Sequence, residues 1–95
     1  MRKMIKSFKH KGLRNYFFKG DSSRINAQHA AKLARILDRL DASKAVKDMD
    51  LPGYGLHPLL GKEKGVWSIW VNGNWRVTFR FDGVDVVDVN YRDYH

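Results

Sequence analysis

Cysteine is absent from the 95-residue chain, which excludes a disulfide framework and a thiolate metal site. No apolar run approaches the roughly 20 residues that a membrane-spanning helix needs. The basic first residues also lack the apolar stretch and the small-residue cleavage site of a signal peptide. We therefore expect a single domain over residues 1–95 that resides in the cytoplasm and has no membrane partner.

Acidic residues are missing from residues 1–20, where seven lysines and arginines occur. The whole chain carries a net charge of +8, so nearly all of the excess positive charge lies in its first fifth. A clustered basic segment attracts polyanions, of which nucleic acid is the most common. A solvated surface that aids solubility is the alternative, but that explanation suits a scattered excess better than a clustered one.

Hydrophobic periodicity predicts helices in the first half of the chain. The elements expected there are a short strand at residues 4–8, helices at residues 11–19 and 26–41, and one or two turns at residues 43–49. Gly20 is the expected end of the first helix and Asn26 the expected N-cap of the second. The apolar stripe of the second helix consists of Ala30, Leu33, Ala34, Leu37 and Leu40.

Alternating apolar and polar residues predict a β-meander in the second half. The expected strands are residues 56–59, 66–71, 75–81 and 84–91. Asn72-Gly73 and Asp82-Gly83 are predicted hairpin turns, and a bulge is expected at Val86-Val87. Helices followed by an antiparallel sheet indicate an α+β fold with the helices packed on one face.

The strand at residues 75–81 separates two kinds of side chain. Its apolar face, which should meet the leucine stripe, consists of Trp75, Val77, Phe79 and Phe81. Its other face consists of Arg76, Thr78 and Arg80. The sequence therefore predicts an open, basic sheet face suited to a backbone of phosphates.

Several enzyme classes lack their signatures. The four histidines do not have metal-ligand spacing, paired carboxylates are missing, and no glycine-rich loop precedes a helix. We therefore expect neither a metal nor a cofactor. Metal-free RNA cleavage remains compatible with the chain. It needs a base for the ribose 2′-OH, cations for the phosphorane and an acid for the departing 5′-oxygen. Suitable side chains are those of His57, Arg76, Tyr94 and His95, although each alone also fits an ordinary surface residue.

Several segments, in the right order, resemble HigB toxins of the RelE/ParE superfamily from bacterial toxin–antitoxin pairs. The resemblance covers residues 4–95 and rests on residues 4–13, 56–59, 65–69, 71–79 and 93–95. The first three residues resemble an extension before the family's usual start, which makes Met4 an alternative start.

The resemblance implies a RelE-like microbial RNase fold and cleavage of translated mRNA in the A site of the 70S ribosome. It also implies a HigA-type helix-turn-helix antitoxin, with operator DNA reached only through that antitoxin. The residues implied to be catalytic are His57, Arg76, Asp93, Tyr94 and His95. The residues expected to bind RNA are Lys6, Lys9, Lys11, Lys62, Lys64 and Arg80.

One position departs from the family. Members usually read His-Pro-Leu-Lys-Gly, whereas residues 57–61 read His-Pro-Leu-Leu-Gly, so Leu60 replaces an active-site lysine. Lys62 and Lys64 are the nearest candidates to supply the missing charge. Two other functions remain open: a ParE-like inhibitor of DNA gyrase on the same fold, and a weakened member that binds RNA or an antitoxin without cutting RNA.

Overall fold

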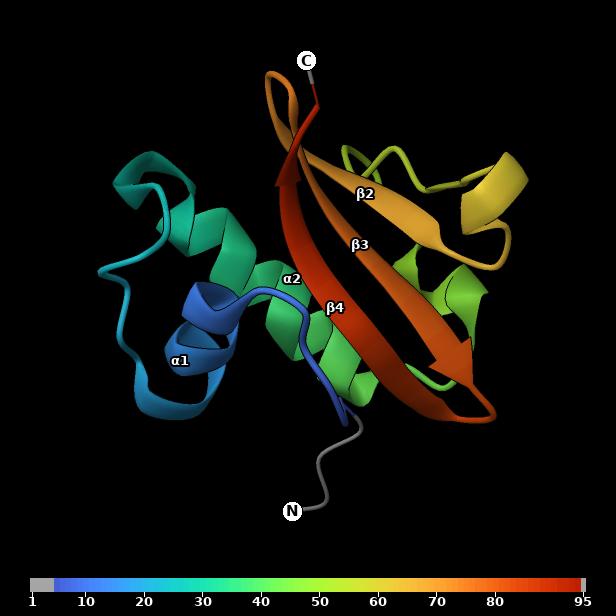
Figure 1. The fold of residues 1–95 in the computed structure, drawn as a ribbon, viewed down its shortest axis with the longest axis horizontal. Coiled ribbons are helices and arrows are strands. Elements are labelled where there is room, and N and C mark those ends of the chain that lie inside the picture. The colour runs from blue at the N-terminus through green and yellow to red at the C-terminus, as the bar shows by residue number, and fades with distance from the viewer. Residues whose placement is uncertain (1–4, 95) are drawn as a thin grey trace.

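Two helices precede a sheet in the computed structural model, which describes residues 5–94 (Figure 1). The helices of this part of the chain are α1, Lys11–Lys19, and α2, Ala30–Ala42, and three 3₁₀ turns accompany them: η1, Ala27–His29, η2, Val46–Met49, and η3, Gly61–Glu63. The strands are β1, His57–Pro58, β2, Trp67–Asn72, β3, Trp75–Asp82, and β4, Asp85–Asp93. They form an antiparallel sheet in the order β1-β2-β3-β4. The predicted α+β fold class is confirmed.

Helix α1 has a defined cap at each end, of which the sequence predicted the one at Gly20. At its start the His10 ring Nδ1 accepts a hydrogen bond from the Leu13 N–H at 2.9 Å. At its end Gly20 adopts a φ of 71° and donates its N–H to the last turn. Gly12 is fixed by packing, because a Cβ there would lie 2.5 Å from the Cβ of Arg24.

The second helix differs slightly from its predicted range. The Asn26 side chain caps the segment by accepting a hydrogen bond from the Gln28 N–H, but the first turn is the 3₁₀ turn η1 and the α-helix begins at Ala30. Its buried stripe includes Ile36, which the predicted stripe omitted, while Ala30 and Ala34 are only half-buried.

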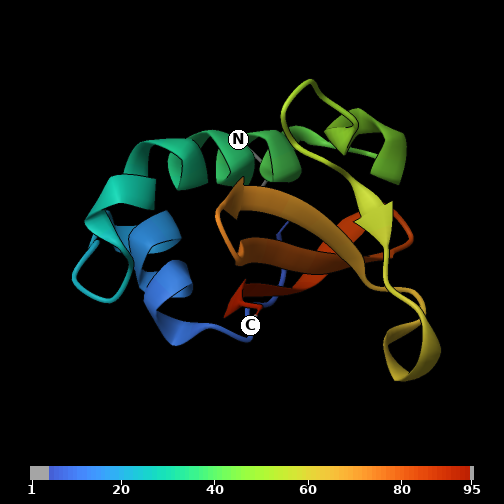
Figure 2. The same cartoon turned by 90° about the horizontal axis from the view of Figure 1, so that it is seen from above.

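The core lies between α2 and one face of the sheet, and Figure 2 shows α2 running across that face. The helix contributes Leu33, Ile36, Leu37 and Leu40, and the sheet contributes Ile69, Val77, Phe79, Val86 and Val89, all of them fully buried or nearly so. Burying each such side chain stabilises the fold by roughly 1.5–3 kcal/mol. The predicted contact between the leucine stripe and the apolar face is therefore confirmed.

The predicted strand at residues 4–8 is wrong as a continuous strand. Met4 lies outside the described residues, and Ile5 and Phe8 make only isolated parallel bridges, to Val86 and Val89. The two bridges are three residues apart on both segments. Backbone hydrogen bonds from Lys6 N–H to Val86 and from Lys9 N–H to Val89 hold the segment along the outer edge of β4.

Both hairpin turns lie one residue later than predicted. Asn72 pairs with Trp75, and Asp82 pairs with Asp85, so the turns are Gly73-Asn74 and Gly83-Val84. Each glycine has a positive φ, whereas the residue after it does not. Glycine at the first turn position is the pattern of a type II′ turn, so glycine at that position sets the register of each hairpin.

A bulge interrupts β4, as the broken alternation predicts, but not at the predicted residues. Thr78 pairs with Asn90 and Arg80 with Val87, so Asp88 and Val89 together lie opposite the single residue Phe79. Asp88 adopts a φ of 55°, and its N–H donates to the Ser7 hydroxyl. The predicted bulge at Val86-Val87 is therefore wrong in position, because the extra residue follows Val87.

An aromatic cluster joins the helices to the ends of β3 and β4. The buried His29 ring is hydrogen-bonded to the Tyr91 hydroxyl, and the Tyr91 ring stacks on Trp75 with 4.5 Å between ring centroids. Burial raises the pKa of Tyr91 above its usual value, so the hydroxyl stays neutral. These contacts hold the carboxyl end of β4 against the start of α2.

The His10 cap predicts a pH-dependent contribution to stability. Burial lowers the pKa of His10 below 6.5, so as the pH falls through 6.5 the unfolded chain takes up a proton before the folded one does. This contribution is complete above pH 6.5 and is lost as the pH falls towards the folded-state pKa.

Urea unfolding at pH 8 and pH 5 measures this contribution. We expect His10→Asn, which keeps a capping oxygen, to lose less stability on acidification than the wild type. His10→Ala should cost about 1 kcal/mol at pH 8. An unchanged difference between wild type and His10→Asn at the two pH values would contradict this role.

Candidate functional site

The sheet face opposite the core carries two rows of polar side chains. Directly paired residues share a face, so His57, Ser68, Thr78 and Asn90 form one cross-strand row. Trp70, Arg76 and Arg92 form the next row. With strands about 4.8 Å apart, the rows lie within a patch roughly 15 Å across. The predicted basic face is confirmed, but it is open only in part, because Ser68 and Thr78 are fully buried.

A pocket of about 360 Å³ lies on this face between β3, β4 and the segment that joins β1 to β2. Thr78 and Asn90 line it on the sheet. Four cationic side chains surround it, namely those of Lys9, Lys62, Arg80 and Arg92, together with the carboxyl groups of Glu63 and Asp88. This excess of positive charge in a concave site suits an anionic ligand.

His57 is exposed on the short edge strand β1. Its Nδ1 lies 2.9 Å from the Gly55 carbonyl oxygen. A carbonyl only accepts hydrogen bonds, so Nδ1 carries the proton in this contact and Nε2 of the neutral ring is left as the basic nitrogen. The backbone thus prepares the ring to accept a proton on the open face.

Two arginines lie opposite each other on β3 and β4. Arg76 donates from Nη1 to the carbonyl oxygens of Gly73 and Trp75, each at 3.1 Å. Its cross-strand neighbour is Arg92. Directly opposed like charges destabilise a sheet, so this pair favours an anion close by.

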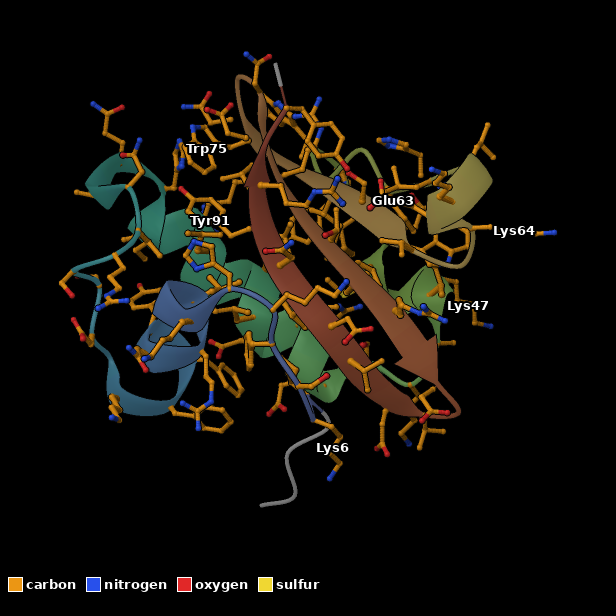
Figure 3. All side chains as sticks on the ribbon, viewed as in Figure 1. Lys6, Lys47, Glu63, Lys64, Trp75 and Tyr91 are labelled. Carbon is orange, nitrogen blue, oxygen red and sulfur yellow. The ribbon has the colours of Figure 1, made fainter. Side chains whose placement is uncertain are left out.

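Glu63 is the anion that contacts Arg92. Its carboxylate accepts hydrogen bonds from both Nη1 and Nη2, at 2.6 and 3.3 Å. These bonds are the main cause of the lowered pKa of Glu63 and of the raised pKa of Arg92. Figure 3 shows Glu63 beside the sheet, reaching towards it from η3.

The predicted C-terminal group is divided by the strand. The Tyr94 ring lies under the Arg92 guanidinium, 4.8 Å from its central carbon, and the buried Tyr94 hydroxyl has no hydrogen-bond partner among the described residues. Asp93 pairs with Trp75. Because paired residues share a face and Trp75 faces the helices, Asp93 lies on the helix face of the sheet. His95 lies outside the described residues. The structure therefore brings Tyr94, but not Asp93, to the face of Arg76.

The six predicted RNA-binding residues are also divided. Lys9, Lys62 and Arg80 line the pocket. Lys6 and Lys11 are exposed but do not line it, and Figure 3 shows Lys6 at the far end of the sheet from Glu63.

Leu60, the residue at the family's lysine position, is 84% exposed at the start of η3. Of the two lysines that follow, Lys62 lines the pocket, whereas Lys64 points away from the sheet (Figure 3). Lys62 is therefore better placed than Lys64 to supply the charge that Leu60 lacks.

Sequence reasoning missed Arg92 and Glu63. The alternation of side chains along β4 could have placed Arg92 on the open face, because it lies two residues after Asn90 and two before Tyr94. The bulge hides which face these residues share. The Glu63 contact depends on the path of the η3 segment, and no periodicity predicts that path.

Residues 5–94 contain no cluster of three or more His, Asp or Glu side chains placed to hold a metal ion. Neither helix in that range is long and apolar enough to cross a membrane.

Comparison with known proteins relates the chain to a toxin family and to one of its characterised members. Residues 6–95 match the family of HigB-like toxins, described as the RelE-like toxin of the type II toxin–antitoxin system HigB. The chain is also similar to the endoribonuclease HigB of Proteus vulgaris, with 45% identity over 92 residues. That alignment covers 97% of this chain and 100% of the relative.

The division of the lysines yields a binding prediction. Lys62→Ala should weaken binding of a short single-stranded RNA and lower the slope of log K against log salt by about 0.7, the contribution of one phosphate contact. Lys64→Ala should weaken binding less. Fluorescence anisotropy at several salt concentrations measures both effects, with Lys47→Ala on the exposed turn η2 as the charge-matched control. Equal losses for all three variants would mean that only net charge matters.

Proposed function

Because the chain belongs to the HigB-like family of RelE-like toxins of type II toxin–antitoxin systems, we propose that it is an endoribonuclease, the activity in the name of its Proteus vulgaris relative. We propose that it cuts translated mRNA in the A site of the 70S ribosome, in the cytoplasm, and thereby inhibits translation. The observation that carries the proposal is the single sheet face on which a pocket rich in cations lies beside His57, Arg76 and Tyr94.

The proposed reaction is metal-free transesterification of RNA. The ribose 2′-oxygen forms a bond to the adjacent phosphorus, and the bond from phosphorus to the 5′-oxygen breaks, which leaves a cyclic phosphate and a 5′-hydroxyl. His57 Nε2 is the candidate base for the 2′-hydroxyl proton, since Nδ1 is held by Gly55. Arg76 stabilises the charge that builds on the phosphorane.

The departing 5′-oxygen needs a proton. We propose that Tyr94 or His95 of the C-terminal group provides it, with Tyr94 supported by the position of its ring next to Arg92, whereas Asp93 lies on the other face of the sheet. The base, the acid and the charge-stabilising group are all side chains of the protein itself, so the proposed mechanism uses no metal and no cofactor.

An antitoxin partner is part of this family's systems. We propose a helix-turn-helix protein of the HigA type, with operator DNA contacted only through it. The exposed basic residues Lys6 and Lys11, together with Lys9 at the pocket, are proposed to face ribosomal RNA, where phosphate contacts are sensitive to salt.

A binding-only function is the second candidate, and the observation that favours it is the apolar, exposed Leu60 at the family's lysine position. An alkyl side chain cannot stabilise a developing phosphate charge. Only the nuclease produces cut mRNA, so this product distinguishes the two functions.

Primer extension on a translated reporter mRNA with purified ribosomes tests the proposal. We expect ribosome-dependent cuts by the wild type, and a loss of roughly 10²-fold or more in His57→Ala, Arg76→Ala and His95→Ala. Lys47→Ala should cut as the wild type does. RNA binding without cuts would instead favour the binding-only function, and DNA damage without cuts a gyrase inhibitor.

The Leu60 position gives a separate prediction. If Lys62 supplies the missing charge, Leu60→Lys should raise cleavage only modestly in the wild type but restore much of the loss in Lys62→Ala. Such a charge contributes up to roughly 10²–10³-fold in rate. Single-turnover cleavage of the four proteins measures this coupling, and failure of Leu60→Lys to rescue Lys62→Ala would show that the two positions act separately.

A further inference from the structure

The contact between Arg92 and Glu63 has the geometry of a guanidinium bound to a phosphate. Two roughly parallel N–H···O bonds join the planar fork of Arg92 to the two carboxylate oxygens of Glu63. A phosphodiester offers the same pair of acceptor oxygens to the same fork. In the free protein, Glu63 therefore occupies the edge of Arg92 that a phosphate would bind.

The surroundings of this pair suit an anion from outside. Lys9, Lys62 and Arg80 line the same pocket, and Lys9 also helps to lower the pKa of Glu63. Arg76 lies directly across the strand pair from Arg92. A phosphate in place of Glu63 would keep Arg92 paired and would also reduce the repulsion between the two arginines.

Displacement of Glu63 requires little disruption. The Arg92 and Glu63 side chains are 30% and 44% exposed, and an ion pair with that exposure contributes little to stability. The segment that carries Glu63 is closed at its base by the hydrogen bond from Leu59 N–H to the Val66 carbonyl. Gly61 and Gly65 flank Glu63 with positive φ angles. Rotation of the Glu63 side chain alone can therefore release Arg92, while the backbone hydrogen bonds of the segment stay in place.

Arg92 has a second support that does not depend on Glu63. Its guanidinium lies 4.8 Å from the centroid of the Tyr94 ring, an arrangement that cation–π attraction stabilises. When Glu63 leaves, this ring still holds the guanidinium on the open face. A phosphate bound by Arg92 would thus lie close to the Tyr94 ring.

We infer that Arg92 is a phosphate-binding residue for the RNA substrate and that Glu63 is an internal competitor, which occupies Arg92 until an RNA phosphodiester displaces it. This inference rests on the proposed function, since RNA is the substrate it assumes. Glu63 then lowers the apparent affinity for RNA by the fraction of molecules in which Arg92 is occupied.

Binding of a short single-stranded RNA with every 2′-hydroxyl methylated tests the inference, because this probe cannot undergo transesterification. Fluorescence anisotropy at low salt compares the wild type with Glu63→Gln, Arg92→Gln and the double variant. We expect Glu63→Gln to tighten Kd roughly fivefold or more. Arg92→Gln should weaken binding, and the double variant should bind as weakly as Arg92→Gln alone.

Asp88→Asn is the matched control for charge. Asp88 lines the same pocket, and asparagine tolerates its positive φ. This variant removes the same negative charge but leaves Arg92 occupied, so its gain in affinity should be clearly smaller than that of Glu63→Gln. An equal gain in Asp88→Asn, or a gain by Glu63→Gln that persists without Arg92, would overturn the inference. Should Arg92→Gln fail to fold, Arg92→Lys keeps the charge without the fork and should lose most of the gain.

The ribosome-dependent cleavage assay separates this inference from the proposed function. Cuts by the wild type together with unchanged RNA affinity in Glu63→Gln would overturn the inference and leave the nuclease intact. Tighter binding by Glu63→Gln through Arg92 without any cuts would support the inference and reject the nuclease. If neither the wild type nor Glu63→Gln binds the probe, the inference fails, and the cleavage assay still decides the function.

Discussion

Burial of only one face of the sheet is the constraint on which the rest of this structure depends. Two short helices supply enough apolar surface to cover one side of β2, β3 and β4, and α2 provides most of it through Leu33, Ile36, Leu37 and Leu40. The other side must then carry polar residues. Because successive residues of a strand point to opposite faces, each core residue of β3 is followed by one that is available for function.

The open face gathers positive charge, which the free protein must balance. Arg76 and Arg92 oppose each other, and Lys9, Lys62 and Arg80 lie nearby. The carboxylate of Glu63 reduces this repulsion from within the chain. Glu63 thus partly neutralises the cations in the free protein, while they stay close together for a phosphate backbone.

Much of this fold follows from sequence patterns, because the patterns reflect local physics. Alternation in β3 and the leucine stripe of α2 predicted both layers of the core, and Gly20 predicted the end of α1. The errors occurred where one residue decides register. A glycine–X turn replaced the expected Asn72-Gly73 turn, and the extra residue of β4 follows Val87 instead of lying at Val86-Val87.

The candidate site was predictable only in part. Family motifs and charge indicated His57, Arg76, Lys9 and Lys62, but the difference between Lys62 and Lys64 depends on the path of the η3 segment. The Arg92–Glu63 contact joins residues that are 29 positions apart in sequence, and it forms only after both β4 and that segment have taken their places. Such contacts depend on tertiary structure, which local patterns do not encode.

The bulge at Asp88 and Val89 changes which residues of β4 face the core. Before it, even-numbered Val86 faces the core, and after it, odd-numbered Val89 and Tyr91 do. A regular β4 of the same sequence, without the bulge, would exchange the two faces from that point onwards, so that Arg92 and Tyr94 would turn towards α2 and Tyr91 towards solvent. The bulge thus decides which residues at the end of β4 face the core and which face the site.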